Sequence, residues 1–299
     1  MARIALKVDV DTYRGTREGA VRLAELLERL DVKATFLFSL GPDHTGRAIK
    51  RVFRRGFLGK VKRTSVLEHY GLRTLLYGVL LPGPHIGRRC REVLRGIGAR
   101  GFEVGVHTWD HIRWQDGVAQ AGETWTRRLL ERAREEFQAV FGRSPLVHGA
   151  AGWQMNRYVP ALQRELGFRY ASDSRGSAPF MPLTADGAVT VPQLPTTLPT
   201  FDELIGREDL PSSDPVEYLL GLTAQAAERD QVFTLHAELE GGKFLGDFER
   251  LLREWRGRGA QLTDLAGYAA SLDLARLPRA RIIEGSVPGR SGTLALQSP

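Results

Sequence analysis

Two apolar runs that lie far apart in the chain each end where a cluster of metal-ligating residue types begins. The run Arg3–Val8 leads into DVD at residues 9–11, and the run 101–106 leads into HTWDH at residues 107–111. Both runs have the pattern of strands, and the carboxyl ends of parallel strands are where α/β barrels and open sheets hold their chemistry. The placement therefore predicts an α/β fold with a site at one edge of its sheet.

The spacing of these residues predicts a divalent metal site. One carboxylate and two imidazoles form a common set of catalytic zinc ligands and leave a position open for water. His107 and His111 are four residues apart and share a face on a helix or tight turn. Asp9 and Asp11 are two apart and share a face on a strand. One aspartate can bind the metal while the other stays free as a base, although either motif alone also fits a chance pair.

Strand and helix patterns alternate through most of the chain, which favours a parallel sheet. Helices are expected over 16–30, 119–141, 158–166, 215–229, 244–258 and 263–272. Further strands are expected over 33–39, 146–149, 168–171, 189–194 and 232–236. From about residue 276 the chain is rich in Gly, Ser, Pro and Arg, and we expect an irregular tail.

The composition is that of a soluble globular protein. Its 299 residues are 42% hydrophobic and 26% charged, both ordinary values. The single cysteine, Cys90, excludes an internal disulfide. The chain has no signal-peptide pattern at Met1 and no apolar run of membrane-spanning length. We therefore expect a cytoplasmic protein.

The net charge of +7 is concentrated in one segment, residues 46–90 and the adjoining Arg91. This stretch holds twelve Lys or Arg and one acid, Glu68, together with many large apolar residues. In Ile49–Leu58 the apolar residues recur at helical spacing, which predicts a basic amphipathic helix at an anionic membrane surface. An ordinary core helix with an insertion is the alternative. Nucleic acid is less favoured, because stacking platforms need aromatic side chains.

The order of polar residues at the expected strand ends resembles that of the NodB-type polysaccharide deacetylases, carbohydrate esterase family four. The resemblance covers roughly residues 2–270. It implies a distorted (β/α)7 barrel over 2–273 that carries 46–90 as a basic, apolar, membrane-facing insertion, followed by a tail over 274–299. By the same resemblance, Asp11, His107 and His111 bind the metal and Asp9 is the catalytic base.

The resemblance also assigns the remaining catalytic side chains. His236, at the end of the expected strand 232–236, corresponds to the general acid, and Asp173 to the acid that orients it. One departure is that the third family motif usually carries an arginine, whereas this chain reads GAAGW at 149–153. Arg175 is a candidate replacement.

Several segments are similar to a deformylase subgroup of the family: VDVDTYRGTREG, FSLGPD, AAGW, SDSRG, LPTTLPTFDELIGR and LHAELEG. This likeness implies removal of the formyl group from 4-deoxy-4-formamido-L-arabinose on undecaprenyl phosphate, in lipid A modification. The enzyme would then attach peripherally to the inner face of the cytoplasmic membrane through 46–90. Zn²⁺ is the expected metal, with Mn²⁺, Co²⁺ or Ni²⁺ also compatible with the ligands. A soluble amidohydrolase of the same fold and a binding protein with a dead site are the alternatives.

Overall fold

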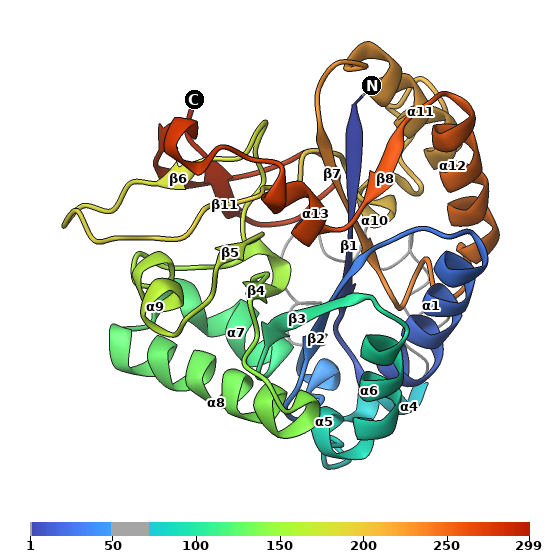
Figure 1. Ribbon diagram of the computed structural model, residues 1–299. Helices are drawn as coiled ribbons and strands as arrows, with labels where there is room; N and C mark the ends of the chain where they lie inside the picture. Colours follow the sequence, from blue (N-terminus) through green and yellow to red (C-terminus); the bar gives the residue numbers. More distant parts are fainter. Residues whose placement is uncertain (1, 49–71) are drawn as a thin grey trace.

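A curved parallel sheet forms the centre of the molecule (Figure 1), in a computed structural model that describes residues 2–48 and 72–299. Its order is β5-β4-β3-β2-β1-β7, with β8 paired to the start of β1. The seven strands are β1 (Arg3–Val10), β2 (Thr35–Ser39), β3 (Glu103–Thr108), β4 (Val147–His148), β5 (Tyr170–Ala171), β7 (Gln231–His236) and β8 (Gln261–Thr263). The predicted parallel α/β architecture is confirmed.

Helices lie around the outside of this sheet (Figure 1). They are α1 (Ala20–Arg29), α4 (Leu72–Leu76), α5 (Ile86–Arg89), α6 (Arg91–Ala99), α7 (His111–Gly117), α8 (Glu123–Phe141), α9 (Val159–Glu165), α10 (Phe201–Leu204), α11 (Pro215–Gln225), α12 (Leu245–Gly257) and α13 (Leu265–Ala270). Within the described residues, short helical turns accompany them: η1 (Gly15–Gly19), η3 (Val118–Gln120), η4 (Ala151–Trp153) and η5 (Leu274–Arg276). None of the helices in the two described ranges combines the length and apolarity needed to cross a membrane.

The core forms because strands covered on both faces bury nearly every side chain. In β1 seven of eight residues are buried, and all five residues of β2 are. This is the expected state of a parallel sheet enclosed by helices. The longest helix, α8, turns one apolar stripe to the sheet: Leu129, Leu130, Ala133, Phe137 and Val140. It ends at Gly142, whose φ of 71° is a left-handed conformation that glycine adopts without strain.

The register of the central strands brings the expected site residues to one end of the sheet. Asp9 on β1 pairs with His236 on β7 and with Leu37 on β2. Leu37 in turn pairs with Gly105 on β3, two residues before His107. The pairing of β2 with β3 shifts register between Phe38 and Ser39, so His107 lies at an irregularity near the end of β3. The sheet therefore aligns the acidic and imidazole motifs before any side-chain contact is considered.

The C-terminal tail differs from its expectation. It contains β9 (Arg279–Ala280), which pairs with β6 (Met181–Pro182), and a hairpin of β10 (Ile282–Gly285) and β11 (Leu294–Gln297). The backbone of Arg175 bonds to both Ala295 and Gln297, and Leu294 is 1% exposed. The expectation of an irregular tail was wrong, because its Gly and Pro residues form turns between short strands.

Two smaller expectations also differ. The run 189–194 is not a strand, and Gln193 makes only isolated bridges to Ala171 and Phe180. The strand β8 was not anticipated, because its three residues are too few to show a pattern. The expected amphipathic helix at Ile49–Leu58 lies outside the described residues.

Candidate active site

The strand β1 delivers three ionisable side chains to the same face. Lys7, Asp9 and Asp11 alternate with buried Val8 and Val10 along the strand and its first following residue. The apolar residues face the helices, so the polar ones face the interior of the curved sheet. This period of two explains why a strand with acids at its end can also belong to the core.

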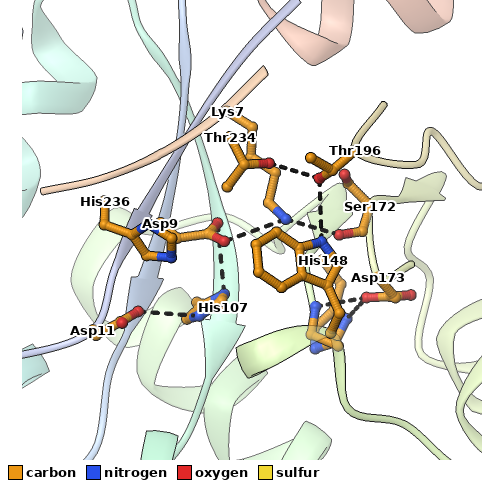
Figure 2. Close-up of polar contacts among 12 residues, drawn as sticks. Lys7, Asp9, Asp11, His107, His148, Ser172, Asp173, Thr196, Thr234 and His236 are labelled. Carbon is orange, nitrogen blue, oxygen red and sulfur yellow. Dashed lines mark hydrogen bonds and ion pairs between the residues drawn. The ribbon is translucent and has the colours of Figure 1, made fainter. Parts of the chain in front are cut away.

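Asp11, His107 and His111 converge (Figure 2 labels the first two). Oδ1 of Asp11 lies 3.2 Å from Nε2 of His107 and 3.3 Å from Nε2 of His111. One ligand atom from each residue lies within 4.8 Å of the other two. Oδ1 is also buried and has no hydrogen-bond partner among the described residues. A carboxylate oxygen facing two imidazole nitrogens fits a divalent metal, and His₂Asp is a donor set used by such ions.

The two histidines reach this point from different elements. His107 is on β3, whereas His111 is the first residue of α7. Asp110 caps α7 by accepting a bond of 3.0 Å from the backbone N–H of Arg113. Its other oxygen lies 2.7 Å from Nδ1 of His44. Asp110 therefore fixes the direction in which α7 presents His111, and the shared helix face considered from the sequence is not the means of convergence.

The electrostatics of the site favour an ionised Asp11. Burial acts to raise its pKa, but the neighbouring His111 and His107 outweigh burial and hold the pKa below its ordinary value. Asp9 lies beside this group, with Oδ1 3.7 Å from Nδ1 of His107. The two aspartates thus have different surroundings: Asp11 faces both histidines, and Asp9 lies behind His107.

His236 lies next to Asp9 at the end of β7 (Figure 2). Its Nδ1 is 3.8 Å from Oδ1 of Asp202, which is on α10, and its backbone N–H donates a 2.8 Å bond to Glu240. Burial acts to lower the pKa of His236, but the surrounding carboxylates, Asp202 first, raise it above its ordinary value. The ring is therefore poised to carry a proton.

The chain is similar in sequence to proteins of a known family. Residues 3–171 match the family model described as polysaccharide deacetylase. A protein of Shewanella sediminis, "Probable 4-deoxy-4-formamido-L-arabinose-phosphoundecaprenol deformylase ArnD", is 32% identical over 100% of this chain and 95% of its own length. The chain belongs to the polysaccharide deacetylase family.

Two further relatives agree with this assignment. The Wigglesworthia glossinidia brevipalpis protein of the same name is 31% identical over 95% of this chain and 98% of its own length. Among solved structures, a putative polysaccharide deacetylase from Mycobacterium smegmatis superposes with a TM-score of 0.65 at 18% identity, covering 96% of this chain and 95% of that one. The structural likeness shows the fold, which is the distorted barrel expected for a polysaccharide deacetylase.

Asp173 does not contact His236, contrary to the expectation. It pairs instead with His148, at 2.7 Å (Figure 2). It also accepts bonds from Gln163 and Gln193. The sheet order explains this, because Asp173 follows β5 and His148 is on the adjacent β4, while β7 lies at the other end of the path. The partner of His236 is Asp202, which lies within the quoted segment LPTTLPTFDELIGR but had no strand pattern to single it out.

Arg175 does not replace the motif arginine that this polysaccharide deacetylase lacks. Its guanidinium makes two bonds to Glu203, of 2.6 and 2.9 Å, and one of 3.0 Å to the carbonyl of Leu198. It also stacks 5.3 Å from the ring of Trp153. Arg175 thus ties the chain after β5 to α10, and no contact joins it to Asp9.

Glu238 is a site residue that the sequence reasoning missed. Its Oε1 accepts bonds from the backbone N–H of Asp11, at 3.2 Å, and of Thr12, at 2.9 Å. A Cβ at Gly15 would lie 1.9 Å from the same oxygen, so only glycine leaves room for this carboxyl group. Burial, with the charge of Asp11, raises the pKa of Glu238 to about 8. Its position two residues after His236, in LHAELEG, was the available signal.

Proposed function

We propose that this polysaccharide deacetylase is a metal-dependent amide hydrolase that removes a formyl group from an amino sugar. The observation that carries the proposal is the convergence of Asp11, His107 and His111 beside two further ionisable groups, Asp9 and His236. Amide hydrolysis needs a polarised carbonyl, a base for water and an acid for the leaving nitrogen. The five side chains supply each of these roles.

The substrate is proposed from the relatives. Two proteins that match this chain over nearly their whole length are named as probable deformylases of 4-deoxy-4-formamido-L-arabinose-phosphoundecaprenol. We assign the same substrate here, so the products are formate and the free amino sugar on undecaprenyl phosphate. The segments that resemble that subgroup in sequence include residues that build the site, among them Asp202 and Glu238.

Asp11, His107 and His111 would hold the metal, with zinc as the first choice for a His₂Asp set and manganese, cobalt or nickel as compatible ions. When bound, such an ion supplies Lewis-acid polarisation of the amide carbonyl and of water. Asp9 takes the proton of the attacking water, because it is the carboxylate of the pair that does not face both histidines. Asp11 is thus the proposed metal ligand and Asp9 the proposed base.

His236 protonates the departing amine. An amide nitrogen is too basic to leave as an anion, so the reaction needs a separate acid. The carboxylates of Asp202 and Glu240 near His236 favour its protonated form, in agreement with the direction of its pKa. Asp202 therefore takes the orienting role that the sequence reasoning gave to Asp173.

Membrane attachment is proposed for a turn within the basic segment 46–90. The turn between α4 and α5 exposes Val79 (53%) and Leu80 (76%), and Leu81 beside them is also exposed. Apolar side chains at a turn, within a stretch of sequence rich in Lys and Arg, suit an interface with anionic lipid. A lipid-linked sugar would meet the enzyme there, at the inner face of the cytoplasmic membrane.

Formate release tests the proposed activity. The purified protein is incubated with the formamido-sugar lipid, then with a chelator, and then with added Zn²⁺, Mn²⁺, Co²⁺ or Ni²⁺ in turn. We expect formate in the first incubation, loss with chelator and recovery with metal. Activity on small soluble formamides but not on the sugar lipid would favour the soluble amidohydrolase. No formate from either substrate, with metal bound, would contradict the proposed activity.

A further inference from the structure

A lysine is fully buried in the centre of the molecule. Lys7 lies on β1 with a relative exposure of 0%, two residues before Asp9 on the same face of the strand. Lysine is almost never fully buried unless its charge is paired. An ammonium group in the interior must therefore have partners that compensate for its lost hydration.

The partners of Lys7 come from three parts of the chain (Figure 2). Its Nζ lies 3.3 Å from Oδ2 of Asp9 and donates a 3.0 Å bond to the carbonyl oxygen of Ser172. The ammonium also lies 5.2 Å from the centroid of the Trp153 ring, within the range of a cation–π contact. A carboxylate, a carbonyl and an aromatic face together surround this charge.

The surrounding residues leave room for this side chain. A Cβ at Gly149 would lie 3.2 Å from Cε of Lys7 and 2.4 Å from a methyl group of Leu37. Gly149, the first residue of the GAAGW motif, thus provides space that the Lys7 side chain occupies. Ser172 directly follows β5, four strands away from β1 along the sheet path, so Lys7 crosses the interior of the curved sheet.

The pairing leaves the two oxygens of Asp9 in different situations. Oδ2 contacts Lys7, whereas Oδ1 is buried without a hydrogen-bond partner among the described residues. Oδ1 is also the atom that lies 3.7 Å from Nδ1 of His107, on the side of the metal ligands. Lys7 thus anchors one oxygen while the other faces the site.

We propose that Lys7 is a positioning residue that fixes the Asp9 carboxylate with Oδ1 directed into the site. This inference rests on the proposed function, in which Asp9 takes a proton from water. Lys7 itself donates no proton and touches no substrate. It supplies, from β1, the cation beside the base that the sequence analysis sought at Arg175.

Two measurements test the inference, turnover and a double-mutant cycle in unfolding. Lys7→Met removes the charge and keeps a chain of similar bulk. We expect kcat for formate release to fall about a hundredfold, as for a misplaced catalytic group, while KM and metal content stay within about twofold. The control is Thr234→Val, since Thr234 is the buried β7 neighbour of Lys7 and its hydroxyl pairs with Thr196. It should leave kcat within about threefold.

The second readout is the urea midpoint of the metal-free chain. When Asp9 is present, Lys7→Met leaves its buried carboxylate without a cation and should clearly lower this midpoint. In the Asp9→Asn variant the same substitution should lower the midpoint much less. Equal shifts in both backgrounds would overturn the inference. If Lys7→Met does not fold alone, folding of the double variant Lys7→Met/Asp9→Asn supports coupling and its failure to fold contradicts it.

The failure of the proposed function would look different. Full turnover by Asp9→Asn would show that Asp9 is not the base, whatever the unfolding cycle reports. A clear coupling in unfolding with unchanged kcat in Lys7→Met would overturn the positioning role. The measurements thus separate an error about Asp9 from an error about Lys7.

Discussion

Replacing Asp202 by asparagine removes the carboxylate beside the proposed general acid. The atoms Nδ1 of His236 and Oδ1 of Asp202 are 3.8 Å apart, and both side chains are largely buried, at 14% and 13% exposure. Unit charges at this distance interact by about 4 kcal/mol at an effective dielectric constant of about 20, and by about 1 kcal/mol in bulk water. Asparagine keeps the shape of the side chain but loses its charge and hence this attraction, so the imidazolium form of His236 becomes less favoured.

The sign of the pH effect follows from the direction of the shift. Asp202 helps to raise the pKa of His236, and a general acid works only while protonated, so kcat falls as pH rises through that pKa. In Asp202→Asn the pKa is lower, and the alkaline limb of the kcat profile moves to lower pH. At about pH 8 we expect a loss of roughly 5- to 160-fold, the range that about 1 to 3 kcal/mol implies.

The assay is formate release against pH, with thermal melts to check that each variant is folded. Asp173→Asn is the matched control, because Asp173 was assigned this role from the sequence and contacts His148 instead. We expect Asp173→Asn to lose stability and keep its alkaline limb in the wild-type position. An unmoved limb in Asp202→Asn, or an equal shift in Asp173→Asn, would refute the reasoning.

Four further substitutions test other parts of the molecule. His111→Ala removes one of three proposed ligands and should leave less than about a tenth of the metal by elemental analysis. Asp9→Asn should keep the metal and lose turnover. Loss of metal in Asp9→Asn would reverse the roles given to the two aspartates. Leu80→Asp should weaken sedimentation with anionic liposomes and spare turnover of a water-soluble formamide, and equal sedimentation of both proteins would exclude the turn from the interface. Leu294→Ala should cost about 2–4 kcal/mol in urea unfolding because the side chain is 1% exposed; a cost near zero would mean that the tail is loosely attached.

The sequence by itself determined the class of fold and singled out the three residues that converge in the candidate metal site. Apolar runs that end in DVD and HTWDH predict a parallel sheet with its site at one edge, because the carboxyl ends of parallel strands meet there. His107, His111 and the pair Asp9 and Asp11 could be selected because residue type and spacing are local properties, whereas the choice of Asp11 over Asp9 came from the family resemblance. The positions of Asp9 and His236 beside them followed from the same logic of strand ends.

The tertiary structure decided which side chains pair with which. Asp173 follows β5 and Asp202 lies on α10. Only the sheet order, with β5 and β7 far apart, assigns the first to His148 and the second to His236. Lys7 is a charged residue within a largely apolar strand, and only the fold brings its partners together from residues 9, 153 and 172. Apart from the contact of Lys7 with Asp9, these contacts join residues that lie 25 to 165 positions apart in the chain, and neither periodicity nor motif spacing carries information over that range.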